Sequence, residues 1–291
     1  MMLHKFIITF IILISFQTSL NAQDIKKDTI PGSKGKLDVA PETKLEKKKE
    51  KNIYSISQFG SESLLFFKQP LRWKGNNWLH VGIIAGGTAL LTLADQPFRD
   101  ASQGNPPGPQ RYYHSAIVEG GRMYGEWYSI GGVAGIFGVY GLIAKDTASK
   151  KIFIELLQSG LYAEGLTTLI KMAVGRSRPY TNEGPSKFRP FTGINKNSNS
   201  FPSGHSTSAF ALSTVMSRHA NSNALKILAY VPAGFTLFSR IYQDKHWVSD
   251  ELLGAAFGFF VGNWVVDIHG SKRHQINVTS IFPPTISFAL N

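Results

Sequence analysis

Hydrophobic residues along this chain gather into segments that are separated by polar turns rich in glycine and proline. Residues 53–68 repeat apolar side chains at near-helical spacing, which predicts an amphipathic helix. After it, six longer segments have a length and composition suited to helices in a core or a membrane. The pattern therefore predicts an all-α fold in which an amphipathic helix precedes a six-helix core bundle. The six segments are Trp78–Ala94, Trp127–Ala144, Ile152–Lys171, Ser206–Arg218, Ala224–Phe238 and Glu251–Val266.

The N-terminus has the order of an export signal. A basic start precedes a short apolar run, residues 6–16, and a small residue, Ala22, follows at a plausible cleavage point. The run is shorter than the roughly 20 residues that a membrane-spanning helix needs. We therefore predict a signal peptide over residues 1–22, with a retained signal anchor as the alternative.

Three further regions complete the predicted domain organisation. Residues 23–52 are rich in lysine and poor in large apolar side chains, which indicates a disordered linker. Residues 53–270 contain all the predicted helices and form the helical-bundle domain. In residues 271–291 apolar positions alternate with polar or small ones, a β-like pattern that predicts a short hairpin or strand.

The chain is strongly basic, with a formal net charge of +12, and it has no cysteine. A basic balance suits nucleic acid, but much of the excess falls within residues 171–250. A basic site directed at phosphorylated substrates or anionic lipid headgroups explains the charge more directly, so no nucleic-acid partner is predicted. The cations concerned are Lys171, Arg176, Arg178, Lys187, Arg189, Arg240 and Lys245, of which Lys187 and Arg189 are candidates to face substrate.

Residues 171–250 contain three short clusters of polar residues, each at the end of an apolar segment. We expect the three clusters to meet in space and to form one phosphate-handling site. They are Lys171-x6-Arg178-Pro179, Pro202-Ser203-Gly204-His205 and Ser239-Arg240-x5-His246-x3-Asp250.

In the third cluster, a helix that starts at His246 would place His246 and Asp250 on one face, because they are four residues apart. A carboxylate beside one imidazole nitrogen fixes the tautomer and leaves the other nitrogen free to attack. The forked guanidinium of Arg240 suits phosphoryl oxygens. Taken alone, this cluster has an alternative interpretation, a His–Asp pair on a helix surface and a solvated arginine.

The second cluster has the form of a helix start, because Ser203 suits an N-cap and proline suits the first turn. A helix start offers free N–H groups to an anion, and Gly204 allows a close approach of the backbone. His205 would then be placed to protonate a leaving oxygen. A capped helix with an incidental histidine is the alternative. The two cations of the first cluster follow a predicted helix, where cations are favourable for dipole reasons alone.

Taken together and in this order, the clusters resemble the three-part signature of the type 2 phosphatidic acid phosphatase and vanadium haloperoxidase superfamily. All the defining positions match, and the resemblance covers roughly residues 75–268. It implies the helical bundle of that family and a phosphohistidine mechanism. Because no acidic cluster in the chain looks like a metal site, we predict an enzyme without a metal ion or other cofactor.

The resemblance also implies a role for each matching residue. His246 is implied as the nucleophile, Asp250 as the carboxylate that orients it, and His205 as the general acid. The implied phosphate cradle consists of Lys171, Arg178, Ser203, Gly204 and Arg240.

The leading functional hypothesis is hydrolysis of a lipid phosphate or pyrophosphate. Candidate substrates are phosphatidate, phosphatidylglycerol phosphate, undecaprenyl pyrophosphate and the phosphates of lipid A. The alternatives are an exported acid phosphatase for small esters, a vanadium-dependent haloperoxidase and a non-catalytic envelope protein. An apolar mouth, which a lipid would need, has three candidate residues, Phe188, Phe191 and Trp247.

The predicted location is the envelope of a bacterium, with a membrane-associated or embedded bundle and a site that faces the periplasm. This predicted location conflicts with a count of the membrane crossings. If the signal peptide is removed and Trp78–Ala94 crosses first, starting outside, Lys171 and Arg178 reach the cytoplasmic side. Either one segment does not cross the membrane, or the whole bundle is exported and only associates with a membrane surface. The sequence makes no prediction of the oligomeric state.

Overall fold

A computed structural model of the protein describes residues 56–104, 114–192 and 195–270. The predicted signal peptide, the lysine-rich linker and the β-like tail lie outside these residues, so those three remain predictions. The chain divides into two compact units, Met1–Ile53 and Tyr54–Asn291, and every described residue belongs to the second unit.

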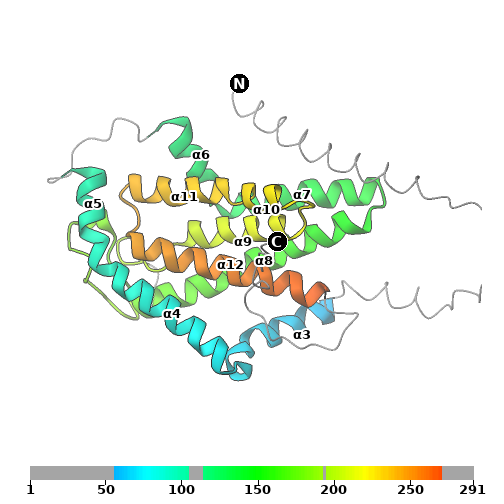
Figure 1. The fold of residues 1–291 in the computed structure, drawn as a ribbon, viewed down its shortest axis with the longest axis horizontal. Helices are drawn as coiled ribbons and strands as arrows, with labels where there is room; N and C mark the ends of the chain where they lie inside the picture. Colours follow the sequence, from blue (N-terminus) through cyan, green and yellow to red (C-terminus); the bar gives the residue numbers. More distant parts are fainter. Residues whose placement is uncertain (1–55, 105–113, 193–194, 271–291) are drawn as a thin grey trace, which may run out of the picture. The chain divides into compact units, whose positions relative to one another are not determined.

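Within the described residues the second unit is built from helices, and no strand occurs beyond a single bridge between Arg176 and Phe188 (Figure 1). This confirms the predicted all-α fold. The helices are α3 (Ile56–Phe67), α4 (Gly75–Leu91), α5 (Asp95–Gln103), α6 (Ala116–Tyr124), α7 (Trp127–Ile143), α8 (Thr147–Val174), α9 (Gly204–Arg218), α10 (Asn223–Leu228), α11 (Val231–Tyr242) and α12 (Val248–Gly270), with short 3-10 turns η2 (Gln69–Arg72), η3 (Thr92–Ala94) and η4 (Pro179–Thr181).

The predicted segments match most of these helices. The amphipathic segment is α3, and five of the six core segments are α4, α7, α8, α9 and α12. The segment predicted at residues 224–238 is divided into α10 and α11, with a proline in the first turn of α11, where proline is tolerated. The short helices α5 and α6 were not predicted, because they are polar and have no long apolar run.

The core of the bundle lies where α8, α9 and α12 pack together. Tyr162 of α8, Ala211 of α9 and Trp264 of α12 belong to one buried cluster, which Phe66 of α3 joins. Glycine allows the close approach of α12 to α9, since a Cβ atom at Gly258 would lie 2.2 Å from the carbonyl oxygen of Thr207. The glycine pattern of α12 therefore marks a close helix contact.

The two ends of the bundle are defined by contacts between helix termini. At the end that we call the site end, α8 finishes and α9 and α12 begin, and the backbone N–H of Ser203 donates to the carbonyl of Asp250 over 3.0 Å. At the far end, Glu155 near the start of α8 lies 2.5 Å from His219 after α9 and 3.5 Å from His269 of α12. The α3 helix is held at this far end.

Several helices carry a surface suited to lipid. Three stretches, Gly75–Gln103, Asn223–Tyr242 and Val248–Gly270, are long and apolar enough to cross a membrane, and α7 is apolar but shorter. Exposing large apolar side chains to water costs free energy in proportion to their area, so these surfaces favour a hydrocarbon environment. The bundle is therefore membrane-associated. Exposed side chains on these helices include Ile83, Leu90, Val139, Leu142, Ile143, Phe235 and Phe238.

Candidate active site

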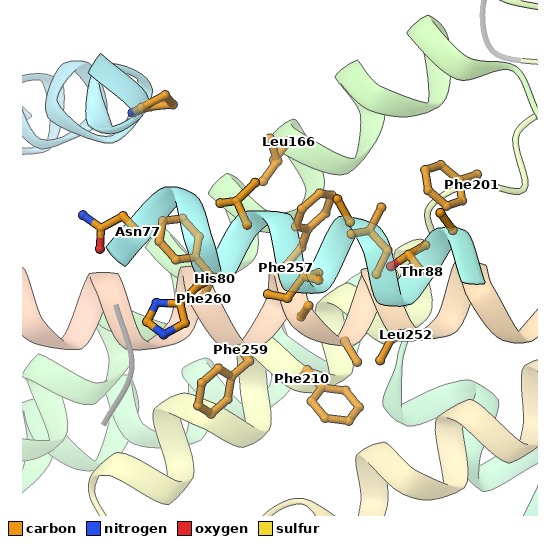
Figure 2. Close-up of a pocket in the computed structure, with 18 of the residues that line it drawn as sticks. Asn77, His80, Thr88, Leu166, Phe201, Phe210, Leu252, Phe257, Phe259 and Phe260 are labelled. Atoms are coloured by element: carbon orange, nitrogen blue, oxygen red, sulfur yellow. The ribbon is translucent and has the colours of Figure 1, made fainter. Parts of the chain in front are cut away.

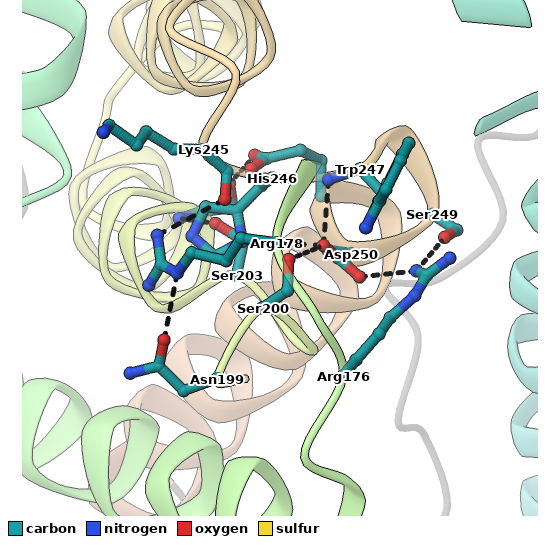
Figure 3. A network of polar contacts seen from close by, with 12 residues as sticks. Arg176, Arg178, Asn199, Ser200, Ser203, Lys245, His246, Trp247, Ser249 and Asp250 are labelled. Atoms are coloured by element: carbon teal, nitrogen blue, oxygen red, sulfur yellow. Dashed lines mark hydrogen bonds and ion pairs between the residues drawn. The ribbon is translucent and has the colours of Figure 1, made fainter. Parts of the chain in front are cut away.

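The structure brings residues of all three predicted clusters together at the site end (Figure 3). The two cations of the first cluster are held by one residue of the loop that precedes the second cluster. Lys171 Nζ donates to the carbonyl oxygen of Asn199 over 2.6 Å, and Arg178 Nε donates to its Oδ1 over 2.9 Å. Asn199 therefore aligns both side chains, a role that no sequence pattern indicated.

His246 is enclosed at the centre of the cluster, with an exposure of 3%. Its Nδ1 lies 3.6 Å from Asp250 Oδ2, slightly beyond a hydrogen bond. Burial lowers the pKa of His246 well below its ordinary value of 6.5, and the nearby charges of Arg178, Lys171 and Arg240 lower it further. The imidazole is therefore neutral at neutral pH and is surrounded by three cations.

The helix does not extend back to His246, because α12 begins at Val248, so the pairing of His246 with Asp250 does not depend on a shared helix face. The side chain of Asp250 reaches back to the turn and accepts a hydrogen bond from the backbone N–H of Trp247 over 2.9 Å. Such a contact satisfies an N–H group at the helix start and favours a boundary at this place. His246 therefore lies in the turn between α11 and α12, and the capping contact of Asp250 places the carboxylate beside the imidazole.

Arg176 was predicted among the cations of a site directed at substrate, and this prediction is wrong. Its guanidinium is buried between two carboxylates, with Nη1 donating to Asp250 Oδ1 over 2.7 Å and Nη2 donating to Asp95 Oδ2 over 2.6 Å. Asp95 begins α5 and also accepts from the backbone N–H and the hydroxyl of Ser249. The positive charge of Arg176 is thus compensated inside the protein. The Arg176 side chain orients the carboxylate of Asp250.

The second cluster forms the helix start that the sequence predicted. Ser203 is the N-cap of α9, and its Oγ accepts a hydrogen bond from the N–H of Ser206 over 3.3 Å. A Cβ atom at Gly204 would lie 3.7 Å from Lys171 Cε, so the helix start and the lysine stem are adjacent. Burial lowers the pKa of Lys171 to about 7, so its amine is partly protonated at neutral pH. Free N–H groups and this amine meet here, which suits an anion.

His205 has a carboxylate partner that the sequence did not indicate. Its Nε2 lies 3.2 Å from Glu126 Oε1, and Arg122 donates to the same oxygen over 2.9 Å. The hydrogen bond with His205 lowers the pKa of Glu126, so this group is a carboxylate at neutral pH. Glu126 is the residue before α7 and lies far upstream of the three clusters, where no motif singles it out.

Arg240, the third cation of the predicted phosphate cradle, is positioned by contacts that lead to α6. Arg240 is buried, with an exposure of 4%, and its Nη1 donates to Gln243 Oε1 over 2.6 Å. Gln243 Nε2 in turn donates to Glu119 Oε1 of α6 over 3.0 Å. The α6 helix therefore holds both Arg240, through Gln243, and the segment that carries Glu126.

Two further predictions about the surroundings of the site need correction. Arg189 was a candidate to face substrate, but it forms an ion pair with Glu183 and donates to the hydroxyl of Ser177 within its own loop. Trp247 was a candidate for an apolar mouth, but it is 1% exposed and its indole N–H donates to the carbonyl of Ser177 over 2.9 Å. Phe188, 45% exposed, and Phe191, 84% exposed, remain available at the surface.

The chain is similar to several known phosphatases. Over 75 residues, 24% of this chain, it is 41% identical to a lipid A 1-phosphatase of Porphyromonas gingivalis, and the aligned part spans 17% of that protein. Among solved structures it is similar to a transmembrane PAP2-type phosphatidylglycerolphosphate phosphatase from Bacillus subtilis, with 19% identity, a TM-score of 0.47, and coverage of 65% of this chain and 95% of that one. It is also similar to LpxE from Aquifex aeolicus, with 18% identity, a TM-score of 0.42, and coverage of 60% and 94%.

A longer match comes from a family model. The sequence model of the PAP2 superfamily, the phosphatase family that the three clusters resemble, matches residues 153–273. This range contains every residue of the three clusters, together with most of α8 and all of α9 to α12. Over this segment, the chain is similar to the PAP2 superfamily.

Proposed function

We propose that the protein is a metal-independent phosphatase that hydrolyses a lipid phosphate or pyrophosphate through a phosphohistidine formed on His246. One observation carries the proposal. A buried, neutral imidazole faces Asp250 and is surrounded by Lys171, Arg178 and Arg240, which come from separate segments of the chain. Phosphoryl transfer depends mainly on positioning and on stabilisation of charge on the equatorial oxygens, and this arrangement supplies both.

The reaction follows in two steps. In the first, His246 Nε2 forms a bond to phosphorus while the bond from phosphorus to the leaving oxygen breaks, and His205 transfers a proton to that oxygen. In the second, water attacks the phosphohistidine, His205 accepts the proton from water, and His246 leaves as neutral imidazole. The three cations and the start of α9 hold the phosphoryl oxygens throughout, and Glu126 stabilises the protonated form of His205.

A lipid substrate is favoured by the surroundings of the site. The helices that carry it are apolar on their outer faces, and Phe191 is exposed in the loop before α9. The lipid A 1-phosphatase relative supports the same substrate class, although the aligned part spans 17% of that protein. The test is phosphate release from a panel of lipid phosphates and small soluble esters in the presence of EDTA. Preference for a lipid supports the proposal, whereas loss of activity with EDTA, or equal activity on small esters, contradicts it.

The acid limb of the pH profile reports the state of His246. Only a neutral imidazole attacks phosphorus, so protonation of His246 removes activity as the pH falls. Because burial and neighbouring cations hold its pKa below the ordinary value of 6.5, we expect kcat/KM to stay high at pH 6.5 and to fall only at lower pH. A profile of kcat/KM on a soluble aryl phosphate measures this. If kcat/KM already fell at or above pH 6.5, the assignment of His246 as the nucleophile would be contradicted.

Glu126→Gln tests the carboxylate partner of His205. The amide removes the negative charge that stabilises protonated His205, so kcat should fall about tenfold or more for an alkyl phosphate, whose leaving oxygen needs a proton. An activated aryl phosphate should be much less affected. Glu183→Gln, which changes a surface carboxylate paired with Arg189, is the matched control. An equal loss on both classes of substrate would rule out this role for Glu126.

We further propose that the site opens to the periplasm. Glu62 of α3 lies 3.1 Å from His269, which places α3 at the far end, and α4 then leads to Asp95 at the site end. One crossing therefore separates residues before α4 from the site. Lysine and arginine concentrate on the cytoplasmic side of membrane proteins, and residues 24–51 contain nine lysines.

Single-cysteine variants can test the orientation, because the chain has no cysteine of its own. Ser186→Cys is exposed in the loop at the site end, and Ala148→Cys is exposed at the start of α8, at the far end. In intact cells with a permeable outer membrane, a thiol reagent that does not cross the inner membrane should label the cysteine at 186 and not the one at 148. The reverse pattern would place the site in the cytoplasm.

A further inference from the structure

A long apolar crevice runs between α4 and α12 and has no part in the proposed phosphate chemistry (Figure 2). Its volume is about 810 Å³. One face of α4 lines it at helical spacing, and one face of α12 lines the opposite wall. The side chains on which the argument depends are Val81, Ala85 and Thr88 of α4 and Ala256, Phe257 and Phe260 of α12.

The crevice lies at the depth of lipid chains. Both helices belong to stretches that are long and apolar enough to cross a membrane. The lining residues of α4 extend from Asn77 to the residue after its end, Thr92, which is about 22 Å at 1.5 Å per residue. One leaflet contributes about 15 Å of hydrocarbon, half of the bilayer core. A space of this length and polarity matches an extended acyl chain, and an apolar void at this depth would lose its dispersion contacts if left empty.

The far end of the crevice has a few polar side chains, and cationic residues lie next to it in the sequence. Gln69, Asn77 and His80 line it there, and the indole Nε1 of Trp73 is buried with no hydrogen-bond partner among the residues that the structure describes. Aromatic and polar side chains at such a level are typical of a headgroup interface. Three exposed cations, Lys68, Arg72 and Lys74, lie in the same segment and favour an anionic headgroup by charge.

The opposite end of the crevice is lined by Arg176 and Phe201, and the guanidinium carbon of Arg176 lies 5.9 Å from the centre of the Phe201 ring. None of the residues of the proposed phosphate cradle lines the crevice. Arg176 binds the Oδ1 atom of Asp250, whereas His246 faces Oδ2. Because Arg176 and His246 face different oxygens of Asp250, we assign the crevice to a lipid other than the substrate.

We propose that this crevice binds one acyl chain of an anionic membrane phospholipid that is not the substrate, with its headgroup at the far end. The lipid fills the space between α4 and α12 and so fixes α4 against the bundle. The short turn η3 connects α4 to Asp95, which holds Arg176 and Ser249. Occupancy of the crevice therefore supports the position of Asp250, and this last consequence rests on the proposed phosphatase function.

Photolabelling tests lipid binding independently of turnover. The purified protein is placed in vesicles of phosphatidylglycerol, or of phosphatidylcholine, that contain a trace of the same lipid with a photoreactive acyl chain. We expect the label on peptides from α4 and α12. The amount of labelled peptide should be several times higher in phosphatidylglycerol vesicles than in phosphatidylcholine vesicles. Ala256→Phe and Ala85→Phe, which fill the crevice from opposite walls, should each reduce this labelling severalfold. Ile83→Phe is the matched control, because Ile83 is 61% exposed and does not line the crevice.

Two results would overturn the proposal. These are equal labelling with the two lipids, or labelling that both filling variants leave unchanged. A second measurement tests the link to the site. Hydrolysis of a small aryl phosphate should fall severalfold in lipid-free detergent, recover with phosphatidylglycerol, and depend less on lipid in Ala256→Phe. Specific labelling without any phosphatase activity would refute the proposed function and leave the lipid site standing.

Discussion

His246→Ala should lower phosphate release by about 10⁴-fold or more, because removal of a nucleophile leaves only the contribution of binding and electrostatics. The imidazole is the group that forms the covalent intermediate, and within the described residues no other histidine lies against both Asp250 and the three cations. The measurement is single-turnover hydrolysis of a lipid phosphate by purified protein. Folding should be retained, since alanine fits the space and leaves Asp250 bound to Arg176, Ser200 and the N–H of Trp247.

His114→Ala is the matched control for this substitution. The His114 side chain is 84% exposed, and it lies 3.6 Å from Glu119 at the surface. Its removal should leave turnover close to that of the unchanged protein. Normal hydrolysis by the His246 variant, or an equal loss in both variants, would show that the nucleophile has been misassigned.

Arg176→Met should destabilise the protein by about 3–5 kcal/mol, the range found when one partner of a buried ion pair is removed. Asp95 and Asp250 would then remain buried, each without the guanidinium that compensates its charge. Both carboxylates would be driven toward protonation or solvent, and the capping contacts at the start of α12 would weaken. Catalysis should also be lost in the fraction that folds, because Asp250 would no longer be oriented. Denaturant unfolding and turnover of the purified variant measure the two effects.

Arg189→Met provides the matched comparison. Arg189 also pairs with a carboxylate, Glu183, but the side chains of this pair are 35% and 34% exposed. Solvent screens such a pair, so its loss should leave the free energy of unfolding close to that of the unchanged protein. Similar stability losses in the two variants would contradict the account of Arg176 as a buried link between α5 and α12. Unchanged turnover in folded Arg176→Met would contradict its role in orienting Asp250.

The fold and the centre of the site could be predicted because their signals are local. The long apolar segments correspond to helices, and Ser203 followed by Gly204 marks the start of α9 as expected from capping chemistry. The three clusters lie together because each occupies a helix end, and antiparallel packing of α8, α9 and α12 brings those ends to one place. His246 and Asp250 are paired for this reason, even though His246 precedes α12 and does not share a helix face with Asp250.

The supporting residues could not be predicted, because they come from segments without a local pattern. Asp95, Glu126 and Asn199 are single polar residues beside turns, and only the packing of α5, α7 and the loop before α9 places them at the site. Arg176 is chemically identical to Arg178 and only two residues away. The turn after α8 directs Arg176 between two carboxylates and leaves Arg178 near His246, a distinction that charge and spacing do not contain.

Direct detection of the covalent intermediate is the most direct test of the account. Purified protein is mixed with a lipid phosphate labelled with radioactive phosphorus, quenched in alkali within the first turnover, and digested for peptide mapping. We predict an acid-labile, alkali-stable phosphoryl group on His246, formed before phosphate release and absent from His246→Ala. Phosphate release with no labelled protein at any time, or with label on another residue, would contradict the proposed mechanism.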